Sequence, residues 1–186
     1  AVIAAGRRHR IVVVAGGGVF ADVVRDVQHG LGINDRIAHE MALQAMRQFA
    51  TALAFMLDPK RGTRLASIND IEGANGSSGI WIWDPCDRRI AESNLPQDWR
   101  VTSDSLSLWL SGQFDSARLL LVKAASPDTV DANVAQLSAV GFVDDYFADL
   151  WPALMPRSWW LSKAQAGLLM DLLDGEELPD QCFIGS

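Results

Sequence analysis

Cysteine is scarce in this chain, which has only Cys86 and Cys182 among its 186 residues. The two lie far apart, and neither has Cys or His neighbours at the spacing of metal ligands. The sequence therefore indicates neither a disulfide framework nor a zinc site. Cys86 lies in an acidic turn beside Asp84, where a carboxylate raises the pKa of a thiol, so a nucleophilic cysteine is not expected.

Long apolar runs and dense basic runs are also missing. No uninterrupted apolar run reaches the roughly 18 residues of a membrane-spanning helix, and the first residues lack the layout of a signal peptide. Lys and Arg number 16 against 23 Asp and Glu, a net charge of -7, which disfavours nonspecific binding to nucleic acid or anionic membranes. We expect a cytoplasmic protein with no nucleic-acid or membrane partner, and the length suits one α/β domain.

Three consecutive glycines, Gly16, Gly17 and Gly18, follow the apolar run at residues 11–14. The segment IVVVAGGGVFADVVR predicts a strand, a loop and the start of a helix. Glycines let ligand oxygens approach the backbone, and the first N–H groups of a helix favour an anion. An anion site and an ordinary Gly-rich turn between core elements both fit, since a lone glycine cluster matches many loops.

The pattern elsewhere predicts alternating strands and helices. The longest helix should run from a cap at Asn34 or Asp35 to about Leu57, and His39 within it is interpreted as a surface or packing side chain. Residues 65–71 and 80–83 predict strands, and the tryptophans around them favour core packing over a stacking platform for a base. One apolar face of the long helix is expected to be buried, formed by Ile37, Met41, Ala45, Phe49, Leu53 and Met56.

Other helix ends are marked by caps and glycines. The opening residues predict the tail of a helix that ends at Gly6. A cap is expected at Thr129 or Asp131, and Asp144 with Asp145 indicates a helix start rather than a metal pair. A last helix should run from about residue 162 to 174, closed by Gly175. Strands that alternate with helices predict a mainly parallel sheet with helices on both faces.

A hydroxyl-rich helix start and a strand-end lysine carry the remaining polar chemistry. Thr102, Ser103 and Asp104 precede the apolar residues of a predicted helix. This pattern fits simple capping, and it also fits a carboxylate that orients cationic groups or magnesium at a phosphoryl-transfer site. RLLLVK predicts a buried parallel strand that ends at Lys123, which would either neutralise phosphate or remain a solvated lysine; spacing alone does not separate the two.

Two common nucleotide-binding motifs do not fit. Gly16, Gly18 and Ala21 match G-x-G-x-x-A after a strand, but the second strand and its acidic residue, about 20 positions on, are replaced by the long helix. No G-x-x-x-x-G-K-[ST] sequence occurs.

The chain contains, in this order, the segments AGGGVFADVVR, AHEMALQAMRQFA, DWRVTSDSLSLWLSG, LLLVKAA and GFVDDYF. Their joint order resembles the amino acid kinase superfamily, the aspartate/glutamate/uridylate kinase group. Within it the chain looks similar to the kinases that phosphorylate a furan phosphate in methanofuran or methylofuran biosynthesis. The resemblance covers roughly residues 11–147, and each segment alone is weak.

This resemblance implies a three-layer αβα sandwich in which ATP, with Mg²⁺, meets a small phosphate-bearing acceptor at the carboxyl ends of the strands. It implies that the glycines 16–18 supply amides to a phosphate, with Asp22 and Arg25 nearby. Thr102, Ser103 and Asp104 match the family's T-S-D or S-G-D segment, whose aspartate organises cationic groups around the transferred phosphoryl. Lys123 matches a strand-end position where many relatives carry Thr-Asp, a change that fits the furan-kinase branch.

The chain departs from the family pattern at its start. The family begins with a strand and a K-x-G-G-S loop whose lysine contacts the transferred phosphoryl, and this sequence contains no such element. Two interpretations stay open: the sequence is a fragment, or this member has lost the lysine and no longer transfers phosphate. Ala15, where the furan kinases often have proline, is a smaller departure.

Two functions therefore compete. The first is an ATP-dependent kinase of a small phosphorylated or carboxylated acceptor, with a furan phosphate preferred over amino acids or uridylate. The second is a noncatalytic nucleotide- or anion-binding subunit on the same fold. The apolar segment LWPALMPRSWWL favours a homo-oligomer interface, although Trp159 and Trp160 could equally be core.

Overall fold

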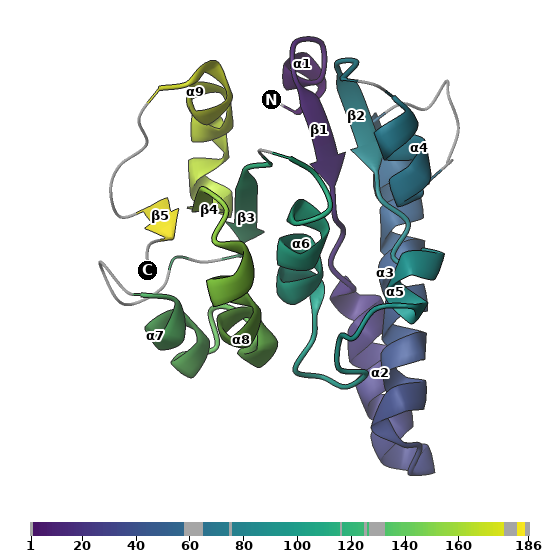
Figure 1. Cartoon of the computed structure of the whole chain (residues 1–186). Coiled ribbons are helices and arrows are strands. Elements are labelled where there is room, and N and C mark those ends of the chain that lie inside the picture. Colours follow the sequence, from purple (N-terminus) through teal and green to yellow (C-terminus); the bar gives the residue numbers. More distant parts are fainter. Residues whose placement is uncertain are drawn as a thin grey trace. The chain divides into compact units, whose positions relative to one another are not determined.

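The computed structural model describes residues 2–57, 65–74, 76–115, 117–124, 126, 133–176 and 182–184. Its contacts divide the chain into two compact units, Arg10–Ser103 and the combination of Ala1–His9 with Asp104–Ser186. Each unit has its own strands and its own helices (Figure 1). The organisation of the whole chain as one domain stays a prediction. The cap expected at Thr129 or Asp131 lies outside the described residues.

The unit Arg10–Ser103 contains a short parallel sheet of β1 and β2. Val13 pairs with Ile82 in its register, and Ala66 adds a parallel bridge to Trp83. The strands predicted at residues 11–14 and 80–83 are thus confirmed to within one residue. The elements of this unit are β1 (Arg10–Val13), α2 (Gly18–Leu31), α3 (Asp35–Leu57), α4 (Ile68–Gly73), β2 (Gly79–Ile82) and α5 (Arg88–Ala91).

The long helix α3 begins and ends where the sequence predicts. The side chain of Asn34 accepts the N–H of Ile37 at 3.0 Å, which caps the helix start. The predicted buried face is only partly correct, because Phe49 is 37% and Met56 70% exposed. The residues of α3 that are buried are mostly alanines: Ala38, His39, Ala45, Met46, Ala50 and Ala54.

Close packing explains the alanine stripe. Ala50 and Ala54 pack with Ala15 and Ile82, while Ala38 and Ala45 pack with Val24 of α2. A small side chain lets two backbones approach closely, whereas a hydropathy pattern ranks Phe and Met above Ala.

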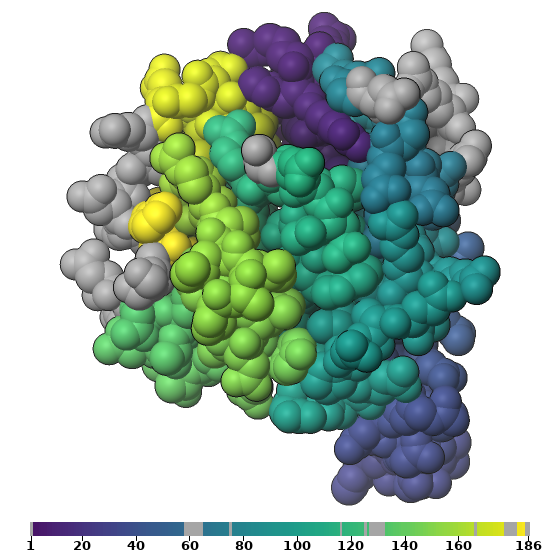
Figure 2. Space-filling view, in the orientation of Figure 1, coloured from purple at the N-terminus to yellow at the C-terminus, as the bar shows by residue number. Residues whose placement is uncertain are grey.

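The turn that connects α2 to α3 lies at the surface. Leu31, next to this turn, is 75% exposed. Figure 2 shows the surface of this end of the α2–α3 hairpin in indigo at the lower right.

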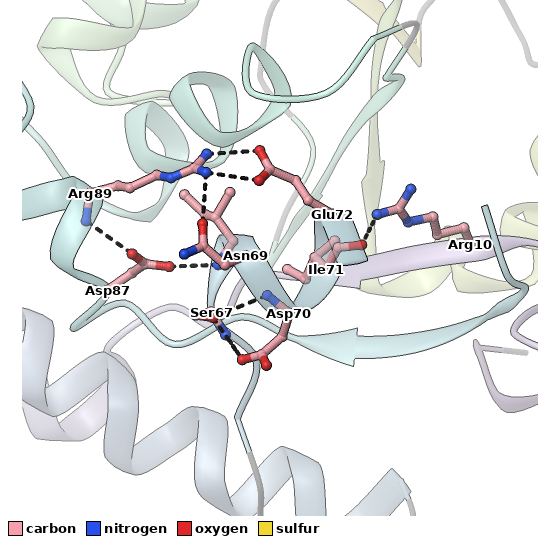
Figure 3. Close-up of polar contacts among 9 residues, drawn as sticks. Arg10, Ser67, Asn69, Asp70, Ile71, Glu72, Asp87 and Arg89 are labelled. Carbon is pink, nitrogen blue, oxygen red and sulfur yellow. Dashed lines mark hydrogen bonds and ion pairs between the residues drawn. The ribbon is translucent and has the colours of Figure 1, made fainter. Parts of the chain in front are cut away.

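The predicted strand at residues 65–71 is wrong, because most of this segment forms α4. Ser67 accepts the N–H of Asp70 at 3.2 Å, and Asp70 accepts the N–H of Ser67 at 2.9 Å, a reciprocal capping box (Figure 3). These bonds satisfy two N–H groups that a helix start otherwise leaves without partners. Only Ala66 takes part in strand pairing.

A second carboxylate ties α4 to α5. Asp87 accepts the N–H of Ile68 at 2.6 Å and the N–H of Arg89 at 2.9 Å, so it serves the start of both helices. The guanidinium of Arg89 then donates to both oxygens of Glu72 and to Asn69 (Figure 3). Helix α4 has six residues and α5 has four, and helices this short are not stable alone in water. These side-chain bonds therefore supply stability that the two helices would otherwise lack.

The other unit contains a three-stranded sheet in the order β3–β4–β5. The central strand β4 is parallel to β3 and antiparallel to β5. The hydrophobic core of this unit contains residues of the strands and of α6, α7 and α8. The elements are α1 (Val2–Ala5), α6 (Ser103–Ser111), β3 (Leu119–Lys123), α7 (Val134–Ala139), α8 (Asp145–Leu154), β4 (Ser158–Ser162), a 3₁₀ helix (Lys163–Leu168), α9 (Leu169–Asp174) and β5 (Phe183–Ile184).

The C-terminal predictions are partly confirmed. Gly175, with φ 88°, closes α9 as expected, but Ser162 ends strand β4 instead of starting a helix, and a 3₁₀ helix follows. Trp159 and Trp160 lie on β4 and are 7% and 6% exposed. They are therefore core residues of this unit. Among the described helices, none is long and apolar enough to cross a membrane.

Replacing Asp87 by Ala should lower the free energy of unfolding by about 1–3 kcal/mol, because two helix-start N–H groups lose their acceptor. Urea titration followed by circular dichroism measures the change. The matched control is Glu92→Ala, which removes only an exposed ion pair with Arg88 and should have a much smaller effect. Equal losses in the two variants would contradict the bridging role of Asp87.

Candidate functional site

The glycine loop connects β1 to α2 within the unit Arg10–Ser103. Gly17 occupies the N-cap position of α2, a 14-residue helix, and as a glycine it supplies no side-chain cap. A Cβ on Gly17 would lie 2.4 Å from the Cβ of Ala21, and Gly18 has a φ of 51°. Both positions therefore require glycine. At the start of α2, the positive end of the helix dipole coincides with an N-cap residue that has no side chain.

Ser103 approaches the same loop. A Cβ built on Gly16 would lie 3.5 Å from the Oγ of Ser103, which is ordinary contact distance. Thr102 directly precedes α6 and is half-buried. The structure thus brings Gly16 and Ser103 together.

Asp22 and Arg25 are paired with each other one helical turn apart. The Nη1 atom of Arg25 lies 3.1 Å from Oδ1 of Asp22, and its guanidinium lies 4.2 Å from the ring centroid of Trp99. The indole N–H of Trp99 in turn donates to Gln28. These contacts attach the segment before Thr102 to α2, a role that sequence reasoning did not find.

Asp104 and Lys123 form an ion pair within the other unit. Asp104 lies in the first turn of α6 and Lys123 is the last residue of β3. The Nζ atom of Lys123 donates to Oδ2 of Asp104 at 2.7 Å, and the side chains are only 22% and 14% exposed, respectively. The ammonium group also lies 5.2 Å from the ring centroid of Phe142.

Burial dominates the acidity of Asp104. Desolvation raises the pKa of this carboxyl above its ordinary value of 3.8, and the charge and hydrogen bond of Lys123 oppose that shift. The nearby carboxylate of Asp144 raises the pKa further, while a hydrogen bond with the backbone of Asp144 lowers it. Asp104 therefore lies in an environment of the kind found where carboxylates act on charged ligands.

The remaining titratable candidates lie elsewhere in the packing. His39 is buried, its Nδ1 lies 3.3 Å from the carbonyl oxygen of Asp98, and burial lowers its pKa, so it is a packing residue. Burial, followed by the charge of Asp84, raises the pKa of the Cys86 thiol. Within the described parts of the chain, no three His, Cys, Asp or Glu side chains gather as metal ligands do.

No protein-family model matches the chain. It is 23% identical over 178 residues to the [5-(aminomethyl)furan-3-yl]methyl phosphate kinase of Methanocaldococcus jannaschii, a match that spans 90% of this chain and 80% of that protein. Its fold is similar to the crystal structure of uridylate kinase from Archaeoglobus fulgidus, with a TM-score of 0.66 and 13% identity over 94% of this chain and 85% of that one.

The chain resembles the amino acid kinase superfamily. Its α/β fold, with parallel strands in both units, is amino acid kinase-like. The fold class that the ordered motifs implied is confirmed, and so is the resemblance itself. The roles of the individual site residues stay predictions.

The double role of Asp144 is the main feature that the sequence did not reveal. A helix start at Asp144 and Asp145 was predicted and is confirmed, since Asp144 caps α8. The same carboxylate, however, also accepts from Ser105, which lies 39 positions earlier in the sequence. A local pattern can identify a cap but carries no signal for such a distant partner.

Gly17→Ala and Gly30→Ala should change stability in opposite directions. The new Cβ at position 17 meets Ala21, so the free energy of unfolding should fall by about 1–3 kcal/mol. Gly30 lies inside α2 with nothing within 4 Å of a built Cβ, so alanine there should raise it by about 0.5–1 kcal/mol. Thermal unfolding of both variants measures this, and a stabilised Gly17→Ala variant would contradict the close packing of the loop.

The raised pKa of Asp104 predicts a specific pH dependence. Between its ordinary pKa of 3.8 and the higher native value, the unfolded chain loses this proton first, so the free energy of unfolding should fall as pH rises. Asp104→Asn should remove that contribution. Urea titrations across this window compare the two proteins, with Asp149→Asn on the exposed side of α8 as the control for one lost charge. A wild type that gains stability relative to Asp104→Asn as pH rises would contradict the assignment.

Proposed function

We propose that this chain is an ATP-dependent kinase that phosphorylates a small acceptor already carrying phosphate, with an aminomethylfuran phosphate preferred. Similarity to two proteins that are both named as kinases supports a kinase-type phosphotransferase. The furan phosphate comes from the name of the curated relative and from the motif order, and it is the finer part of the proposal.

The observation that carries the proposal is the ion pair between Asp104 and Lys123. A phosphoryl transfer needs positioned positive charge more than covalent chemistry. A half-buried ammonium at a strand end supplies that charge, and a carboxylate 2.7 Å away fixes its direction. Partial exclusion of water strengthens the field of such a group.

The proposed reaction requires no strong base. An ionised oxygen of the acceptor's phosphate attacks the γ-phosphorus of ATP, the bond from that phosphorus to the β–γ bridging oxygen breaks, and ADP leaves with the bond's electron pair. No proton has to be removed from the acceptor. Lys123 would lower the energy of the charge on the transferred phosphoryl, and Asp104 would hold Lys123 in place.

The glycine loop is assigned to phosphate binding. The N–H groups at the start of α2 and at Gly16, Gly17 and Gly18 would donate to phosphate oxygens, with the hydroxyls of Thr102 and Ser103 as further donors. Arg25 would support this loop through its contact with Trp99, and Asp22 through its ion pair with Arg25. Mg²⁺ would come to the site with ATP, bound to the phosphates of the nucleotide.

Release of ADP from magnesium-ATP tests the proposal, with an aminomethylfuran phosphate, glutamate, aspartate and UMP as acceptors. We expect turnover with the furan phosphate and a loss of about 10²-fold or more in Asp104→Asn, because the ammonium loses its charged partner. Lys123→Gln should lose activity similarly. Asp149→Asn, which removes an exposed carboxylate from α8, is the matched control and should keep full activity.

Other results would redirect the assignment. Turnover with UMP or an amino acid alone would keep the kinase and replace the acceptor. A folded protein that binds ATP but turns over none of the four acceptors would contradict the proposal and favour a noncatalytic nucleotide-binding subunit.

A further inference from the structure

We propose that Asp144 is a positioning residue for the Asp104–Lys123 pair. The inference extends the proposed function and rests on it for its kinetic part. It rests structurally on contacts made within a single unit, by residues of α6, β3 and the start of α8.

One carboxylate serves the first turns of two helices. Oδ2 of Asp144 accepts the N–H of Ser105 in α6 at 3.0 Å, and Oδ1 accepts the N–H of Phe147 in α8 at 2.9 Å. The hydroxyl of Ser105 also donates to Oδ1. Asp144 thus connects the start of α6 to the start of α8 through three hydrogen bonds.

These bonds control the residue next to Ser105. Asp104 directly precedes Ser105 in the first turn of α6. Because the backbone of Ser105 is held in place, the orientation of the Asp104 side chain relative to α6 is restricted as well. Ser105 is fully buried, and water therefore cannot easily take over its bonds. Loss of Asp144 should allow the turn to move and lengthen the 2.7 Å bond to Lys123.

The same segment also contacts the lysine. Phe142, two residues before Asp144, has its ring centroid 5.2 Å from Nζ of Lys123. Phe142 is 9% exposed and meets the ring of Trp160 edge-on at 5.3 Å, and Val143 is 2% exposed. Residues 142–144 therefore hold both members of the pair against the core of this unit.

The charges around Asp104 support this arrangement. Lys123 attracts its carboxylate and Asp144 repels it, and both effects are felt in the pKa of Asp104. Asp144 thus helps to direct Asp104 toward Lys123.

The test compares Asp144→Asn with Asp145→Asn. Asp145 carries the same charge in the same turn but is exposed, so it is the matched control. We expect kcat of Asp144→Asn to fall by about 10²-fold with little change in KM for ATP, because a small displacement of a charged group has this effect. Asp145→Asn should retain wild-type kcat. In an Asp104→Asn background, Asp144→Asn should cost little more, since both act through the same pair.

Two further variants separate positioning from stability. Asn133→Ala removes the side-chain cap of α7 in the same unit, so it should lower the melting temperature without lowering kcat. Ser105→Ala removes one of the three bonds and should lower kcat less than Asp144→Asn does, even if the latter folds poorly. The same fractional loss of kcat from Asp144→Asn with or without Asp104, or no loss at all, would overturn the proposal.

A readout without substrate keeps this inference distinct from the proposed function. The NMR signal of the Lys123 ammonium should exchange faster with water in Asp144→Asn than in wild type or Asp145→Asn. An unchanged signal would overturn the positioning role. An inactive wild type whose ammonium signal nevertheless responds in this way would instead contradict the kinase assignment alone.

Discussion

The starts of the helices impose the constraint on which most of this structure depends. Each helix start presents N–H groups without partners, and most helices here are too short to be stable on propensity alone. Side chains supply the missing acceptors at α3, α4, α5, α7 and α8. Two of these acceptors, Asp87 and Asp144, each serve two helices and so also fix how neighbouring helices lie within a unit.

Helix α2 departs from this pattern. It follows a run of glycines, and its N-cap residue Gly17 supplies no side-chain cap, although the helix has 14 residues. Gly17 and Gly18 are required there by the contact with Ala21 and by a positive φ. The N-cap residue of this helix has no side chain to serve its first N–H groups, and the proposed function assigns those groups, with the helix dipole, to phosphate.

The sequence predicts what local patterns encode. A cap at Asn34 or Asp35 and the absence of Gly and Pro after it predict a helix to about Leu57, and α3 has these bounds. Its buried face is nevertheless misjudged, because close packing selects Ala50 and Ala54. The S-x-x-D pattern of Ser67 and Asp70 could have revealed α4 in place of a strand. The bond from Ser105 to Asp144 joins residues 39 positions apart, and no local signal encodes it.

The Asp104–Lys123 pair is poorly explained by stability. Taking two charges out of water costs free energy that their attraction often only balances, and apolar residues of similar size commonly serve a core as well. Here the burial is strong enough to raise the pKa of Asp104 despite the lysine beside it. The protein nevertheless surrounds the pair with a buried aromatic ring and a doubly used helix cap. The proposed function gives this costly arrangement a use, because an ammonium group fixed in a partly water-excluded environment would bind a phosphoryl group more strongly than a solvated lysine.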